Sequence, residues 1–72
     1  MIELLPKLDE HKKEPLYLQL YTYIRTEIEK GSIQQKEKLP SIRSLSAKLG
    51  ISITTVRTAY DQLLMEGYIL SQ

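Results

Sequence analysis

Two short segments with helical periodicity meet at one glycine within residues 39–69, and this arrangement constrains the fold more than any other feature of the chain. Before Gly50 the apolar residues form a one-sided stripe: Ile42, Leu45 and Leu49. After Gly50 they follow the i, i+3, i+4, i+7, i+8 spacing of an amphipathic helix, at Val56, Ala59, Tyr60, Leu63 and Leu64. Ser41 and Ser52 stand where an N-cap accepts hydrogen bonds from free backbone amides. The pattern predicts helices at 41–49 and 52–66, joined by a tight turn in a helix-turn-helix.

A third amphipathic segment precedes this pair. Pro15 suits the start of a helix, and Gly31 supplies a C-terminal stop. Between them apolar residues recur every four positions, at Leu16, Leu20, Ile24 and Ile28. We therefore predict a helix at 15–30, an N-terminal arm at 1–14, and one domain at 15–72. Residues 68–70 read as a strand that needs a partner.

Length and composition exclude several classes of protein. With 72 residues the chain is one domain at most, and with no cysteine it has no disulfide framework or thiolate metal site. It has no membrane span of roughly 18 apolar residues, and its first residues lack the shape of a signal peptide. A cytoplasmic protein is expected.

Positive charge is concentrated on the predicted helix-turn-helix, although the net charge of the chain is only +1. Residues 32–60 contain one acid, Glu37, and five basic residues: Lys36, Lys38, Arg43, Lys48 and Arg57. Phosphates of a nucleic acid would be attracted to such a surface. A solvated face of ordinary composition explains the charge equally well.

The outward face of the last helix carries small hydroxyls and one arginine in its first turns. Thr54 and Thr58 lie opposite the apolar face, and Thr55 and Arg57 flank this outward face. Threonine can bond to phosphate or base, and arginine can reach a guanine edge or a phosphate. The alternatives are an Arg57–Asp61 pair at i+4, and serines and threonines that only cap or occupy the first turn.

Arg43, in the first turn of the preceding helix, would reinforce phosphate binding near Ser41. Catalytic chemistry is not indicated. His11 is the only histidine, and no metal-ligand spacing, Ser-His-acid set or glycine-rich phosphate loop is found. An enzyme is not expected.

The chain resembles the N-terminal winged helix-turn-helix domain of GntR-family bacterial transcription regulators over about residues 15–70. The matching positions are Pro15-Leu16-Tyr17, Ile24-Arg25, Gly31, Leu39-Pro40-Ser41, Arg43, Leu45, Leu49-Gly50, Ser52, Thr55-Val56-Arg57, Ala59-Tyr60, Leu63 and Glu66-Gly67-Tyr68. The phrases PLYLQLY and AYDQLLMEGYI look most like the MocR subfamily, whose C-terminal aminotransferase-like domain binds pyridoxal phosphate. The YtrA subfamily, with a small dimerising tail, is the alternative.

The resemblance implies DNA contacts at Arg43, Thr54, Thr55 and Arg57, with Ser41 and Ser52 near phosphates. Lys36 and Lys38 are further candidates for phosphate contacts. Two features depart from the family. Family members usually carry arginine at the position of Ile53, which we expect to pack against the domain. The second wing strand and its glycine are also missing, so we expect the chain to be a fragment of a longer regulator.

The sequence thus predicts a mainly α fold: a three-helix winged helix-turn-helix with a short, truncated β-wing. Its predicted function is sequence-specific binding of a double-stranded DNA operator, with the recognition helix 52–66 in the major groove. The protein would act as a homodimer through a missing C-terminal domain, with no cofactor in this chain itself. The main alternative is a winged-helix-like module for protein–protein contact. A further alternative is a small helical protein whose arm docks on a partner.

Overall fold

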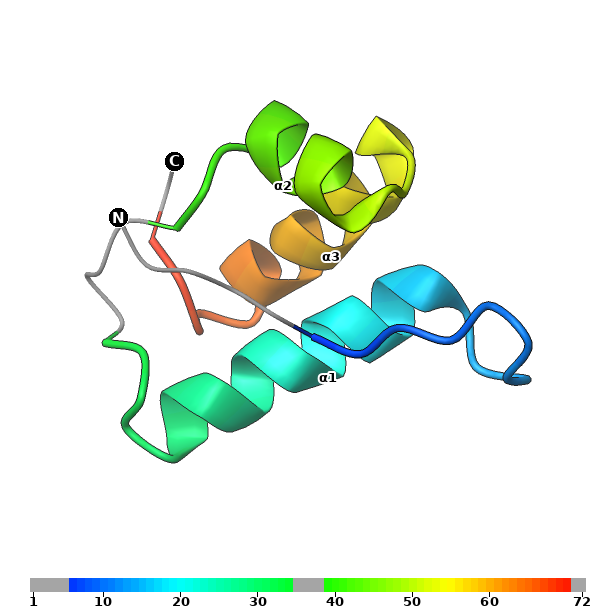
Figure 1. The fold of residues 1–72 in the computed structure, drawn as a ribbon. Coiled ribbons are helices and arrows are strands. Elements are labelled where there is room, and N and C mark those ends of the chain that lie inside the picture. Colours follow the sequence, from blue (N-terminus) through cyan, green and yellow to red (C-terminus); the bar gives the residue numbers. More distant parts are fainter. Residues whose placement is uncertain (1–5, 35–38, 71–72) are drawn as a thin grey trace.

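The computed structural model describes residues 6–34 and 39–70, and within these ranges the chain forms three helices (Figure 1). Their bounds are Leu16–Glu29 for α1, Ile42–Leu49 for α2 and Ile53–Met65 for α3. The predicted helices at 15–30, 41–49 and 52–66 are confirmed, since each differs from the observed helix only by its capping residues.

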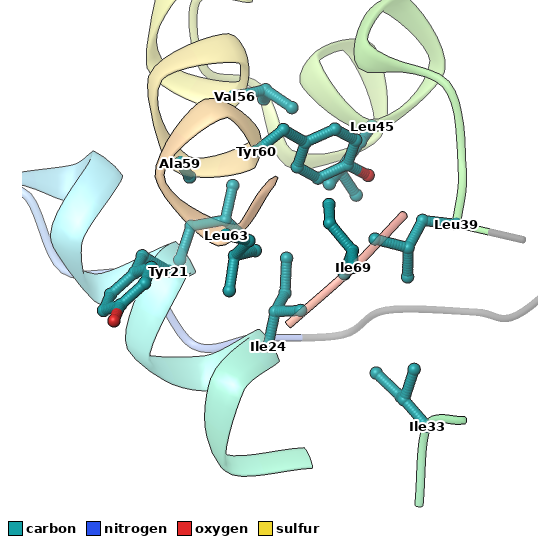
Figure 2. Packing of buried hydrophobic residues seen from close by; sticks show 11 residues of the cluster. Tyr21, Ile24, Ile33, Leu39, Leu45, Val56, Ala59, Tyr60, Leu63 and Ile69 are labelled. Atoms are coloured by element: carbon teal, nitrogen blue, oxygen red, sulfur yellow. The ribbon is translucent and has the colours of Figure 1, made fainter. Parts of the chain in front are cut away.

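The recognition-helix candidate α3 packs against both other helices (Figure 1). Its buried face meets α1 at Leu63 and Ile24, whose side chains point toward each other (Figure 2). The apolar stripes predicted from the sequence supply most of this core, although their members Ile28, Ile42, Leu49 and Leu64 are only half-buried against it. The buried apolar cluster comprises Leu20, Tyr21, Ile24, Ile33, Leu39, Leu45, Val56, Ala59, Tyr60, Leu63 and Ile69.

The turn between α2 and α3 depends on Gly50. Its backbone φ is 69°, in the left-handed region that costs a side chain with a Cβ atom about 1 kcal/mol or more. The amides of Gly50 and Ile51 both donate to the carbonyl of Ser46, which closes the end of α2. Residues 50–52 then lead directly into α3.

The strand predicted at 68–70 is wrong, because the structure forms no strand anywhere in the residues it describes. The segment instead follows the C-terminal turn of α3, where the Tyr68 amide donates to the Leu63 carbonyl at 2.9 Å. Ile69 is only 4% exposed and packs into the core between the helices. The apolar character that indicated a strand therefore comes from side-chain packing, and no backbone partner pairs with this segment within the described ranges.

Residues 6–14 lie along α1 and are held there by one glutamine side chain (Figure 1). The Gln19 amide accepts from the Asp9 N–H at 2.9 Å and donates to the Asp9 carbonyl at 2.9 Å. It also donates to the Glu14 carbonyl at 2.8 Å. Leu8 packs against the core from the same segment. Gln19 is thus buried with its amide group satisfied, as a buried polar group requires.

A polar cluster joins the C-terminal end of α3 to α1. The Tyr21 hydroxyl hydrogen-bonds to the Glu66 carboxylate, and this bond lowers the pKa of the Glu66 carboxyl. The Arg25 guanidinium lies 5.2 Å from the centre of the Tyr21 ring, within the range of a cation–π contact. Tyr68 donates to Glu29 of α1 at 3.3 Å. These contacts join the C-terminal end of α3 and the segment after it to α1.

Candidate nucleic-acid interface

Two serines begin the helices of the helix-turn-helix. The Ser41 hydroxyl accepts from the Ser44 amide at 3.1 Å, and the Ser52 hydroxyl accepts from the Thr55 amide at 3.0 Å. Both serines are exposed and have extended backbone angles. The predicted caps are confirmed. Each satisfies one of the free amides of its helix and leaves the others pointing to solvent, where a helix N-terminus attracts anions.

A groove of about 470 Å³ separates the first turns of α2 and α3. The structure brings three predicted site residues together here: Ser41 and Arg43 from the start of α2, and Arg57 from α3. Both arginines are exposed, and no hydrogen bond or salt bridge joins their guanidinium groups to another residue in the described ranges. Their guanidinium groups are therefore available to an external anion.

The acids of α3 lie away from this groove. Asp61 and Glu66 line a separate shallow hollow along the C-terminal half of α3, together with the exposed Met65. Asp61 forms no ion pair with Arg57 at i+4, so the pairing alternative is not seen in the described structure. The charge of α3 is thus divided along its axis, with a free cation near its N-terminus and acids near its C-terminus. This division favours entry of the N-terminal end into a polyanion.

The threonine hydroxyls of α3 differ in whether they are already hydrogen-bonded within the protein. Thr54 is exposed, and its hydroxyl makes no hydrogen bond within the described residues. Thr55 is half-buried, and its hydroxyl lies 2.7 Å from the Ser52 hydroxyl. The Thr58 hydroxyl donates back to the Thr54 carbonyl at 2.8 Å. Thr54 is therefore the one with a fully free hydroxyl, whereas Thr55 extends the cap of α3.

Tyr60 forms the buried wall of the groove. Its side chain is 1% exposed and its hydroxyl donates to the Pro40 carbonyl at 2.7 Å. Burial raises the pKa of Tyr60 to about 12. This bond links the middle of α3 to the residue before Ser41, the N-cap of α2.

The sequence pattern missed two apolar residues of the groove, Ile42 and Ile53. Ile53 was expected to pack against the domain, yet it is 37% exposed. A helical wheel gives the direction of a side chain around the helix axis but not its position along that axis. Ile53 is the first residue of α3 and lies beyond the end of the core. Lys36 and Lys38, the two loop candidates, lie outside the described residues.

Among the described residues, no group of three or more histidine, cysteine or acidic side chains is placed to hold a metal ion. His11 lies exposed in the arm, where its amide donates to the Asp9 carboxylate at 2.9 Å. None of the described helices has the length and apolarity to cross a bilayer.

Comparison with known proteins agrees with this geometry. The profile of "Bacterial regulatory proteins, gntR family" matches residues 16–72. The HTH-type transcriptional regulator YhdI of Bacillus subtilis is 44% identical over 71 residues, which cover 99% of this chain and 15% of that protein. The probable rhizopine catabolism regulatory protein MocR of Rhizobium meliloti is 42% identical over 65 residues, or 90% of this chain and 13% of that protein.

A solved structure, YtrA from Sulfolobus acidocaldarius, is described as a GntR-family transcription factor. It superposes with a TM-score of 0.86 at 42% identity, covering 92% of this chain and 70% of that chain. This chain therefore spans a small part of YhdI and MocR but most of YtrA. The profile match, the identities and the shared fold establish that this chain belongs to the gntR family of bacterial regulatory proteins, as a helix-turn-helix DNA-binding domain.

Proposed function

We propose that this chain reads the operator of a bacterial transcription regulator by placing the N-terminal end of α3 in the major groove. The observation that carries the proposal is the groove between the first turns of α2 and α3, where two capped helix ends and two free arginines share one face. No acidic residue lines that groove in the described structure. Such a surface suits the phosphates and guanine edges of duplex DNA.

Each site residue has a proposed role. Arg57 reaches a base edge from the second turn of α3, and Thr54 offers its free hydroxyl beside it. Arg43 and Ser41, at the start of α2, hold a phosphate. Ser52 and Thr55 keep the start of α3 intact and lie near the backbone of the DNA. Lys36 and Lys38 add phosphate contacts.

The whole protein is proposed to be a MocR-type regulator that acts as a cytoplasmic homodimer. The likeness to YhdI and MocR, in which the matched domain is a small part of a long chain, supports this assignment. We propose that pyridoxal phosphate binds a C-terminal domain and no residue of this chain. The alternative is a YtrA-type regulator, supported by the likeness to YtrA. Sequencing the gene beyond Gln72 separates a long aminotransferase-like domain from a short dimerising tail.

The experiment that tests DNA reading compares Arg57→Ala with Lys30→Ala. Both changes remove one positive charge, but Lys30 is the C-cap of α1. That end of α1 lies on the opposite side of the molecule from the start of α3 (Figure 1). Duplexes enriched from a random-sequence library by the 72-residue chain serve as operator, and shuffled duplexes serve as reference. Affinity is measured by fluorescence anisotropy.

We expect Arg57→Ala to weaken operator binding by about 1–3 kcal/mol and shuffled-duplex binding far less, since a base contact is lost. Lys30→Ala should leave both affinities nearly unchanged. Equal losses on both duplexes would make Arg57 a phosphate contact. Absence of any DNA binding would favour the protein–protein module instead.

A further inference from the structure

Ile53 places an apolar side chain in the mouth of a positively charged groove. It is 37% exposed, whereas the core isoleucines Ile24 and Ile69 are 0% and 4% exposed. The groove it lines is otherwise formed by Ile42, the buried Tyr60, the serine cap of α2 and the two free arginines. Its lining therefore combines an apolar surface with two unpaired cations.

Helix formation and core packing do not account for an isoleucine at this position. A β-branched residue forms helix less readily than alanine does, by a few tenths of a kcal/mol. Ile53 is also absent from the buried cluster and from the half-buried residues packed against it. Ile53 and Ile42 instead line the groove beside the two arginines, where they offer an apolar surface to a group that enters it.

The charges beside Ile53 identify the chemistry of such a group. The guanidinium groups of the exposed Arg43 and Arg57 have no ion-pair or hydrogen-bond partner among the described residues, so the groove favours an anionic occupant. It must also present an apolar group a few ångströms from its charges. In the major groove of duplex DNA the C5-methyl of thymine is such a group, set among base-edge acceptors and near the phosphates.

We infer that Ile53 is a specificity-determining residue that packs on the C5-methyl of one thymine in the operator. The inference rests on the proposed function, because it places the same helix end in the major groove. Burial of one methyl against Ile53 corresponds to about a fourfold preference for thymine over a base without that methyl. Arg57, one turn further along α3, reads a neighbouring base pair.

The test uses the duplex that the 72-residue chain enriches from a random-sequence library. Each enriched thymine is replaced singly by deoxyuridine, which removes the methyl and keeps the base pairing. With the unchanged chain we expect affinity to fall about fourfold at one position. With Ile53→Ala the same replacement should have no effect, because the contacting side chain is gone.

Met65→Ala is the matched control. Met65 is an exposed apolar residue at the other end of the same helix, 84% exposed and outside the groove. The Met65→Ala variant should show the same loss of affinity on deoxyuridine replacement as the unchanged chain. Ile53→Val, which keeps the β-branched shape, should retain part of it. Thermal melts show whether each variant is folded. The deoxyuridine series on the unchanged chain does not depend on the folding of any variant.

Three results overturn the inference. If no thymine responds to deoxyuridine, or if the response persists in Ile53→Ala, Ile53 does not read a methyl while operator binding by the chain stands. If the chain enriches no sequence and binds no duplex, the proposed function fails and the inference fails with it. The first two results and the third are therefore distinguishable in one series of titrations.

Discussion

The hydroxyl of Tyr60, in the middle of α3, donates a 2.7 Å hydrogen bond to the carbonyl of Pro40, the residue before the cap of α2. Both partners are buried. The bond connects the helix that carries Arg57 to the segment that leads into Arg43, and both arginines line the groove beside Tyr60. Stability and DNA binding should therefore both depend on Tyr60.

Replacement of Tyr60 by phenylalanine tests this link. Tyr60→Phe keeps the ring in the core but leaves the buried Pro40 carbonyl without its donor, which costs about 1–3 kcal/mol. Urea denaturation should show that loss of stability. If the free energy of unfolding is unchanged, water reaches the carbonyl and the link is not structural.

The same residue predicts how stability changes with pH. Burial raises the pKa of Tyr60 from its ordinary value near 10 to about 12 in the folded chain. The unfolded chain loses this proton first, so the contribution is complete below about pH 10 and is lost as the pH rises towards about 12. Between pH 9 and pH 12 the free energy of unfolding should fall more steeply for the unchanged chain than for Tyr60→Phe. This variant retains the remaining tyrosines and so serves as the control. Parallel curves would contradict the raised pKa.

The assignment of the faces of α3 is tested by two truncations on the same helix. Leu63 is fully buried in the core, so Leu63→Ala should cost roughly 2–5 kcal/mol, enough to unfold a domain of this size. Met65 is 84% exposed, so Met65→Ala should change stability by less than about 0.5 kcal/mol. Thermal melts measure both. If Leu63→Ala melts at the same temperature as the unchanged chain, the assignment of the buried face of α3 is wrong.

Capping and DNA contact can be separated at Ser52. Ser52→Ala removes the acceptor for the Thr55 amide and should cost about 0.5–2 kcal/mol. Ser52→Asp keeps an acceptor there, so stability should be retained, but its negative charge faces the proposed phosphates. We expect Ser52→Asp to lose DNA affinity while its melting temperature stays near that of the unchanged chain. Normal DNA affinity in Ser52→Asp would mean that the start of α3 does not face the duplex.

Local signals made most of the fold predictable from the sequence. Glycine after each apolar stripe and serine before two of them marked the helix ends to within one residue, because caps act through neighbouring backbone groups. Residues 68–70 were misread because an apolar segment around a buried isoleucine looks the same in a strand and in a turn that packs on the core. The groove could not be predicted, because it arises where the first turns of α2 and α3 meet, and periodicity does not show how far apart two helices lie.

Salt dependence of DNA binding tests the central claim, that the groove with Arg43 and Arg57 faces a duplex. The logarithm of the association constant should fall linearly with the logarithm of salt concentration. In the double variant Arg43→Ala/Arg57→Ala the slope should be shallower by about 1–2, since one or two phosphate contacts are lost. Lys30→Ala should keep the original slope. The account would be contradicted by a double variant with the slope and affinity of the unchanged chain, or by no duplex binding at any salt concentration.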